Sequence, residues 1–256
     1  MNLLKIILFE LQEITNLIIA AFLGLFKSPR YFSEIIKQMD LIGVGSLPIV
    51  VLTGFFTGGV LVLQSYPTFE YYSIQNTVGK TIATSLMREL GPVLTALMVS
   101  GRIGSAIAAE LGSMVVSQQI DAMRALGTDP NRKLVAPRLL ALMLMLPLLT
   151  VAADIFGIIG GGIVASGIFN LDSNIYITSV RYGISTPDII GGVVKPLFFG
   201  LIIGSIACYR GLSTTGGTVG VGRSTTNAVV LASIVVIIFD FFLSQALNTI
   251  LGIRYI

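Results

Sequence analysis

LLALMLMLPLLTVAADIFGIIGGGIVASGIF, residues 139 to 169, contains a single charged residue, Asp154. Spanning the hydrocarbon core of a bilayer takes about 20 apolar residues, and this run exceeds that length. The rest of the chain suits the same environment, because 54% of the 256 residues are hydrophobic, 11% are charged and the mean hydropathy is +0.90. Soluble domains have about a quarter of their residues charged. The sequence therefore predicts an all-α integral membrane protein.

Five segments in all have the length and composition of transmembrane helices. They are residues 42–65, 82–109, 139–169, 189–209 and 227–251. Most of the 16 lysines and arginines fall on one side of the membrane if the N-terminus is cytoplasmic. Positive charge favours the cytoplasmic side, so we expect the N-terminus inside and the C-terminus outside. Residues 42–256 are thus expected to form one five-span membrane domain.

The first 41 residues differ from these spans because polar residues interrupt them. Glu10, Glu13 and Asn16 recur every three residues and therefore share one face of a helix. This pattern indicates an uncleaved helix lying in the membrane interface, with a spanning helix as the alternative. The apolar spacing after Pro29 predicts a second short amphipathic helix. Residues 1–41 are therefore expected to form an interfacial elbow.

Composition also limits the chemistry that the chain can carry. There is no histidine, and Cys208 is the single cysteine, so a Cys/His zinc cluster, a His-ligated haem and an internal disulfide are excluded. The formal charge of +3 comes without a basic patch interleaved with aromatic residues. We therefore interpret the basic residues as topology signals and expect no nucleic-acid partner.

One stretch, GGTVGVGRST at residues 217–226, nearly matches the phosphate-binding loop G-x-x-x-x-G-K-[ST]. It has Arg223 in place of lysine, and it joins two predicted spans, whereas a phosphate-binding loop lies between a strand and a helix. Residues 235–240 (VVIIFD) likewise continue into an apolar span and have no sheet to join. We therefore predict no ATPase site here, and a glycine-rich cytoplasmic connection with Arg223 near lipid headgroups or a partner.

Charged residues inside the spans are the first candidates for function, since an ionisable side chain at bilayer depth is costly. Arg88 and Glu89 lie about two turns into the second span, and Lys195 lies about two turns into the fourth. All three are expected at similar depth, so Glu89 and Lys195 could pair with Arg88 nearby. The surplus positive charge could attract an anionic headgroup. The alternative is an ion pair that only sets helix register.

Asp154 and Asp240 are each alone in a span, and the sequence assigns them no partner. They leave two other classes of protein open. An ion-coupled secondary transporter would use Glu89, Asp154 or Asp240 as its ion site, although we find no internal repeat. An intramembrane aspartyl enzyme would pair Asp154 with Asp240, although the flanking residues contain no further catalytic group.

The loop between the second and third spans is patterned like a helix. Its apolar stripe consists of Val115, Val116, Ile120, Met123 and Leu126, together with Gln119. Gly127 supplies a stop, and Asp121 and Arg124 fall on a wet face. We predict a cytoplasmic helix at about 109–127 that docks into a groove of a soluble partner. The alternative is a helix that merely lies along the membrane.

Three stretches resemble the signature sequences of the MlaE/YrbE-type permeases. They are RELGPVLTALMVSGRIGSAIAAELGSM (88–114), QIDAMRALGTDP (119–130) and VGRSTT (221–226). The resemblance extends from about residue 45 to the C-terminus. Asp121-Ala122-Met123 followed by Gly127 also resembles the Glu-Ala-Ala…Gly coupling loop of bacterial ATP-binding-cassette importers, with Asp in place of Glu and Met in place of the second Ala.

This resemblance implies a homodimeric permease in the inner membrane of a double-membraned bacterium. It would move phospholipids between the inner and outer membranes and so maintain the asymmetry of the outer membrane. Two cytoplasmic ABC ATPase subunits would bind ATP and Mg, so this chain would need no cofactor, and a periplasmic ring of MCE-domain proteins would cap the dimer. An accessory cytoplasmic subunit could join them.

The resemblance also implies roles for particular residues. Positions matching Arg88, Glu89 and Lys195 would line a lipid cavity between the two protomers. The segment from 110 to 129 would form the coupling helix that receives the motion of the ATPase. Its expected coupling residues are Glu110, Gly112, Asp121, Arg124, Gly127 and Asp129.

Overall fold

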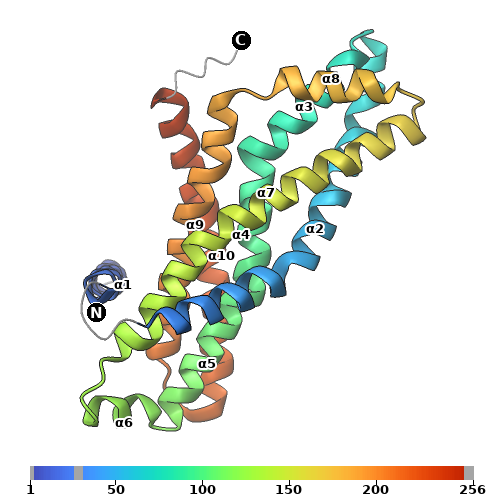
Figure 1. Ribbon diagram of the computed structural model, residues 1–256. Coiled ribbons are helices and arrows are strands. Elements are labelled where there is room, and N and C mark those ends of the chain that lie inside the picture. The colour runs from blue at the N-terminus through green and yellow to red at the C-terminus, as the bar shows by residue number, and fades with distance from the viewer. Residues whose placement is uncertain (1–2, 26–30, 251–256) are drawn as a thin grey trace. The chain divides into compact units, whose positions relative to one another are not determined.

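The computed structural model describes residues 3–25 and 31–250, and every regular element within them is helical (Figure 1). Five helical segments are long and apolar enough to cross a membrane: Phe32–Tyr71, Gln75–Val116, Asn131–Gly167, Thr186–Leu212 and Gly217–Ile250. Among the described residues, the prediction of an all-α chain with five spans is therefore confirmed.

Contacts between residues divide the chain into two units. Unit 1 comprises residues 1–42, 99–145 and 198–236, and unit 2 comprises residues 43–98, 146–197 and 237–256. Each of the five long helical segments contributes residues to both units. The boundary predicted between residues 41 and 42 coincides with no helix end, because α2 runs without interruption over Phe32–Tyr71.

The N-terminal elbow differs from the expectation. α1 (Leu3–Leu25) is a helix as predicted, and Glu10 on its polar face accepts two hydrogen bonds from Arg210, at 3.1 and 2.9 Å. The second short helix is not a separate element, since the residues expected to form it are the first turns of α2. Pro29 lies outside the described residues. No proline or glycine interrupts α2 before Gly43, so the helix continues into the first span.

In unit 2, glycines bring α2 and α7 (Ala136–Gly167) into close contact. A Cβ atom added to Gly58 would lie 1.8 Å from the carbonyl oxygen of Gly157, and one added to Gly160 would lie 2.1 Å from that of Phe55. A Cβ atom added to Gly54 would likewise lie 2.5 Å from the carbonyl oxygen of Ala153. Glycine at these positions therefore lets the two helix backbones approach closely.

The second span is one continuous run in which two π-helical turns, Leu86–Leu90 and Ser100–Gly104, separate α3 (Val78–Ser85), α4 (Gly91–Val99) and α5 (Ser105–Val116). α8 (Ser173–Gly183), which the sequence analysis did not predict, lies beside α3 (Figure 1). Tyr176 of α8 is buried and donates a hydrogen bond of 3.0 Å to the carbonyl oxygen of Ile158. Burial raises the pKa of Tyr176 to about 12, so its hydroxyl stays protonated as a donor.

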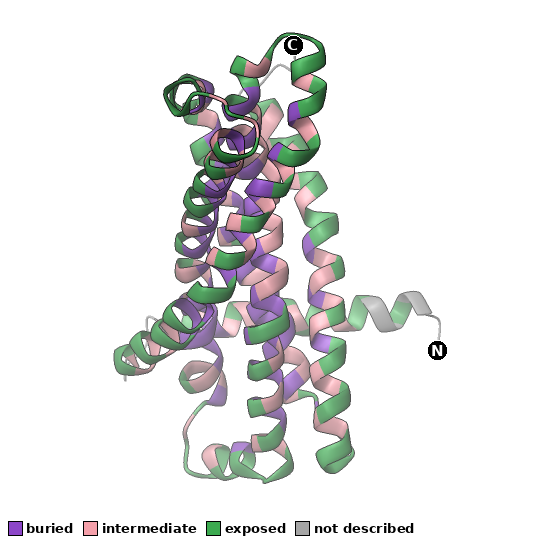
Figure 2. Cartoon of the chain, turned by 90° about the vertical axis from the view of Figure 1, so that its right-hand side faces the viewer, coloured by how far each residue is buried: buried purple, intermediate pink, exposed green. Residues whose placement is uncertain are grey.

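The last two helices complete the fold. α9 (Thr186–Leu212) packs closely on α7 in unit 1, where a Cβ atom added to Gly200 would lie 2.6 Å from the carbonyl oxygen of Leu142. Cys208, also in α9, has no exposed surface. α10 (Gly217–Ile250) begins ten residues earlier than predicted, so residues 217–226 form its first turns and the expectation of a glycine-rich connection there is wrong. Figure 2 shows exposed residues along the helices, and on α10 they include many large apolar side chains, as membrane-facing helices have.

Candidate functional site

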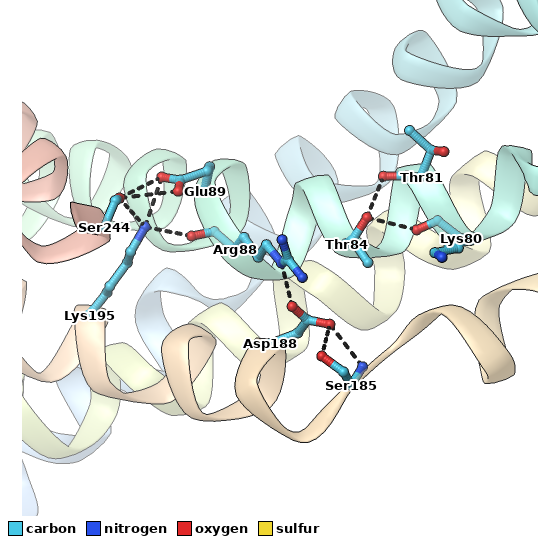
Figure 3. A network of polar contacts seen from close by, with 9 residues as sticks. All are labelled: Lys80, Thr81, Thr84, Arg88, Glu89, Ser185, Asp188, Lys195 and Ser244. Carbon is cyan, nitrogen blue, oxygen red and sulfur yellow. Dashed lines mark hydrogen bonds and ion pairs between the residues drawn. The ribbon is translucent and has the colours of Figure 1, made fainter. Parts of the chain in front are cut away.

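Lys195 is the centre of a polar cluster in unit 2 (Figure 3). Its side chain is 3% exposed, and its ammonium group donates hydrogen bonds to Glu89 Oε2 at 2.7 Å and to Ser244 Oγ at 2.7 Å. It also forms an ion pair of 3.1 Å with Asp240 Oδ1. The predicted meeting of Glu89 and Lys195 is confirmed. The sequence assigned Asp240 no partner, and the structure supplies one, because α10 brings Asp240 and Ser244 to the same ammonium group.

The backbone carbonyl of Arg88 is a further acceptor for Lys195. Pro92 has no backbone N–H, so it cannot bond the carbonyl of Arg88 four residues earlier. Lys195 Nζ donates to that carbonyl oxygen over 2.6 Å. Arg88 lies within the π-helical turn Leu86–Leu90, which ends two residues before Pro92. Such turns are frequent at functional sites. The local break in the helix thus contributes to the cluster.

Arg88 itself pairs with Asp188, which the sequence analysis did not single out. The Asp188 side chain is fully buried, and it also accepts hydrogen bonds from the backbone N–H of Ser185 at 2.8 Å and from its hydroxyl at 2.7 Å. In the sequence S-T-P-D, this arrangement caps the N-terminus of α9. Arg88 is therefore attached to the first turn of α9 (Figure 3).

The charge of the cluster differs from the prediction. Two cations, Arg88 and Lys195, lie among three carboxylates, Glu89, Asp188 and Asp240. If all five groups are ionised, the cluster carries no surplus positive charge, and the expected attraction of an anion by a net positive cluster is wrong. Attraction of an anion must instead come from a cation whose donors are not used by these carboxylates.

Arg88 is that cation. Its side chain is 31% exposed, whereas that of Lys195 is 3% exposed. Of its three guanidinium nitrogens, the ion pair with Asp188 uses Nε. A cavity of about 20 Å³ borders Arg88, Glu89, Gly191, Lys195 and Asn248. That volume admits a water molecule or two, so a larger ligand at Arg88 would need further walls.

Asp154 lies apart from this cluster, in α7 of unit 2. It is 5% exposed, and its Oδ1 has no hydrogen-bond partner among the residues that the structure describes. A Cβ atom on Gly91 would lie 1.9 Å from this oxygen. Asp240 meets Lys195, so the structure gives no support to the pairing of Asp154 with Asp240 that an aspartyl enzyme would need.

The predicted coupling helix is two helices. α5 ends at Val116, and Gln118 adopts a left-handed conformation with φ of 58° before α6 (Gln119–Ala125) begins. The prediction of one helix with a single apolar stripe is therefore wrong, because the turn at Gln118 divides it. Gly127 ends α6 with φ of +75°, and the N–H groups of Gly127 and Thr128 bond the carbonyls of Arg124 and Met123 at 3.0 and 2.9 Å. The predicted stop at Gly127 is confirmed.

The six predicted coupling residues all lie in unit 1 and differ in their contacts. Glu110 pairs with the buried Arg138 at 2.8 Å, and Gly112 lies against Thr214, so these two contribute to internal packing. Asp121 and Arg124 form an exposed pair at 3.3 Å. Asp129 accepts a hydrogen bond of 2.9 Å from the N–H of Asn131. Asp121, Arg124 and the neighbouring Leu126, which is 83% exposed, are accessible to a partner.

Comparison with known proteins assigns a family to this arrangement. Residues 35–246 match the family described as Permease MlaE. The chain belongs to this family. The MlaE match covers both the Lys195 cluster and the coupling segment, and it stops before the last residues of α10.

Several members and relatives of the MlaE family are similar over most of this chain. A probable ABC transporter permease of Rickettsia bellii is 44% identical over 94% of this chain and 90% of its own length. A probable ABC transporter permease of Synechocystis is 43% identical over 82% of this chain and 80% of its own length. The intermembrane phospholipid transport system permease protein MlaE of Haemophilus influenzae is 36% identical over 89% of this chain and 88% of its own length.

Three residues of the cluster in this MlaE permease were missed from sequence: Asp188, Ser185 and Ser244. For the first two a signal existed, because S-T-P-D at 185–188 fits the capping pattern [ST]-x-x-[DE] at the start of a helix. Ser244 gave no such signal. It lies four residues after Asp240 and so shares its helix face, but only packing shows that this face meets Lys195.

Proposed function

We propose that this chain is the membrane-spanning subunit of an ABC transporter that moves phospholipids between the inner and outer membranes of a bacterium. Membership in the MlaE permease family supports the transporter class, and the name of the Haemophilus relative supports the phospholipid cargo. The observation that supports a role for a particular residue is the partly exposed Arg88 side chain, which pairs with Asp188 through Nε and could bind the phosphate of a headgroup through its terminal nitrogens.

In this proposal Arg88 contacts lipid and Lys195 positions it. Lys195 is buried and already has four oxygen partners, so it is less suited to bind a headgroup directly. By holding the carbonyl of Arg88 and the carboxylate of Glu89, it fixes the segment that presents the Arg88 guanidinium. Glu89, which is 44% exposed, is the second group at the surface of the cluster.

The assembly around this chain is part of the same proposal. A second copy supplies the missing walls, because the cavity of about 20 Å³ beside Arg88 is far too small for a phospholipid. Cytoplasmic ABC ATPase subunits bind ATP and Mg and dock on the exposed segment around Asp121, Arg124 and Leu126. A periplasmic ring of MCE-domain proteins receives or delivers the lipid, with an accessory cytoplasmic subunit as a further component. The N-terminus is cytoplasmic and the C-terminus is periplasmic.

ATP binding would then act on the cavity through the coupling segment. Closure of the ATPase subunits displaces α6, and Glu110 at the end of this path is joined to Arg138 of α7. The dimer cavity narrows and expels its lipid. An ion-coupled transporter is less well supported, because two of its three candidate carboxylates, Glu89 and Asp240, are already paired with Lys195.

A purification from cells that express the tagged chain at native level tests the proposal. Mass spectrometry of the material extracted in mild detergent should find an ATPase subunit, an MCE-domain protein and bound phospholipid. Arg88→Glu and Lys195→Asp should reduce lipid transport while the ATPase subunits remain attached. If the chain purifies without any ATPase, the ABC assignment fails. If both variants transport lipid normally, the lipid contact at Arg88 is wrong.

A further inference from the structure

A second and larger cavity lies in unit 1, where α9 ends and α10 begins. Its volume is about 280 Å³, close to the lower limit of roughly 300 Å³ for small-ligand sites. Apart from two glycines and Val219, every residue of its wall has a polar or charged side chain: Arg210, Ser213, Thr215, Arg223, Ser224 and Asn227. Such a lining is unlike the apolar walls that acyl chains require.

One wall of this cavity is a guanidinium held in place. Arg210 of α9 makes two hydrogen bonds to Glu10 of α1, at 3.1 and 2.9 Å, and lies over the ring of Tyr209. Two of its five N–H groups are thereby used, and Nε is buried without a hydrogen-bond partner among the described residues, so one N–H on each terminal nitrogen remains for a ligand or water. Because Glu10 balances the charge of Arg210, this pair contributes donors and rigidity more than net charge.

The opposite wall is one face of α10. Gly220, Arg223, Ser224 and Asn227 recur at helical spacing, so they line the cavity together. Arg223 is exposed, and no carboxylate within the described residues pairs with it. Arg223 therefore gives the cavity its uncompensated positive charge.

The chain between these walls adds a tight turn. Gly216 and Gly217 have φ of +87° and +67°, a conformation that glycine adopts readily. Gly220 lies so close to this turn that a Cβ atom would be 1.9 Å from the carbonyl oxygen of Thr215. The glycines of the stretch 217–226 thus shape the cavity, although the stretch is helical and does not form a nucleotide-binding loop.

We propose that this cavity binds a phosphate-bearing anion between Arg210 and Arg223, with the hydroxyls of Ser213, Thr215 and Ser224 as further donors. The source is either the headgroup of an anionic phospholipid or a free phosphate ion. This site is separate from the Lys195 cluster, since the two are built from different units. It does not depend on the proposed function, and either can fail without the other.

Binding to the purified full-length chain, in a detergent without phosphorus, tests the proposal. The probes are a short-chain phosphatidylglycerol, a diacylglycerol of the same chain length that lacks phosphate, and inorganic phosphate, each measured by native mass spectrometry. Arg223→Gln removes the uncompensated charge. Arg181→Gln is the matched control, because Arg181 is also exposed but belongs to α8 of unit 2.

We expect the native chain and Arg181→Gln to bind phosphatidylglycerol and not the diacylglycerol, and Arg223→Gln to bind it at least about tenfold more weakly, as loss of a charge-assisted hydrogen bond predicts. Competition by inorganic phosphate, or binding of inorganic phosphate alone, identifies a free anion as the source. The absence of competition identifies the lipid headgroup. If Arg223→Gln binds both phosphate probes as the native chain does, or if the native chain binds neither, the proposal is wrong. A loss seen with Lys195→Gln but not with Arg223→Gln would support the Lys195 cluster and overturn this site.

Discussion

The ammonium group of Lys195 lies 2.6 Å from the backbone carbonyl oxygen of Arg88. Pro92, four residues further along, has no N–H to donate to that carbonyl. Lys195 therefore completes the hydrogen bonding of a neighbouring helix as well as neutralising two carboxylates. A residue with both tasks should affect stability and transport separately, and the following variants distinguish the two.

Lys195→Met should lower the free energy of unfolding by about 1–3 kcal/mol, because Asp240, the more buried of the two carboxylates, loses its cation and the carbonyl of Arg88 loses a donor. Chemical unfolding in detergent measures this loss. Adding Glu89→Gln and Asp240→Asn to the same chain should recover most of the stability, since no charge then remains uncompensated, but should not recover lipid transport. A single variant as stable as the native chain would show that the cluster contributes no net stability.

Asp188→Ala should destabilise the protein by about 1–3 kcal/mol, since Ser185 loses the acceptor for both of its hydrogen bonds and Arg88 loses its partner. Asp188→Asn keeps an acceptor oxygen for Ser185 and should lose less. The midpoints of thermal unfolding of the two variants make the comparison. Equal losses would mean that the charge facing Arg88, and not the helix cap, is what matters at this position.

Gly58→Ala should separate α2 from α7, because its Cβ would lie 1.8 Å from a backbone oxygen of Gly157. Overpacking of this kind typically costs about 1–3 kcal/mol. Gly167→Ala is the control, since a Cβ at Gly167 meets nothing within 4 Å. Thermal unfolding should show a clear loss for the first variant and little change for the second. The same midpoint for both would contradict the close helix contact.

Leu126→Asp should weaken attachment of the ATPase roughly tenfold or more, since a buried leucine contributes about 1.5–3 kcal/mol to a contact. Leu126 is 83% exposed, so the fold should not change. Tyr182→Asp, at a residue 84% exposed on α8, is the matched control. The quantity to measure is the amount of ATPase subunit that copurifies with each variant. Unchanged copurification with Leu126→Asp would remove α6 and its end from the docking surface.

The sequence was sufficient for the spans and for one ion pair. Long apolar runs report burial in a bilayer directly, and the equal depth of Glu89 and Lys195 followed from counting residues along two helices. Asp240 was left without a partner, because counting residues along its own helix does not show which neighbour it faces. Its rotation toward Lys195 is set by packing between helices, which a single helix pattern does not contain.

The coupling segment shows a different limit of sequence reasoning. Its apolar residues fit one helix, yet the chain turns at Gln118 in a left-handed conformation that glycine would have signalled and glutamine does not. The π-helical turns are equally hard to predict from sequence, because no residue type in Leu86–Leu90 marks these five residues as π-helical. Such local departures depend on tertiary contacts more than on intrinsic preference.

The burial of Cys208 has a practical consequence for labelling chemistry. It is the single cysteine of the chain, and its side chain has no exposed surface. Alkylating reagents need an accessible thiolate, so they should leave the folded protein unmodified. A cysteine introduced at an exposed position such as Leu126 or Arg223 can then carry a fluorophore or spin label, without first removing Cys208.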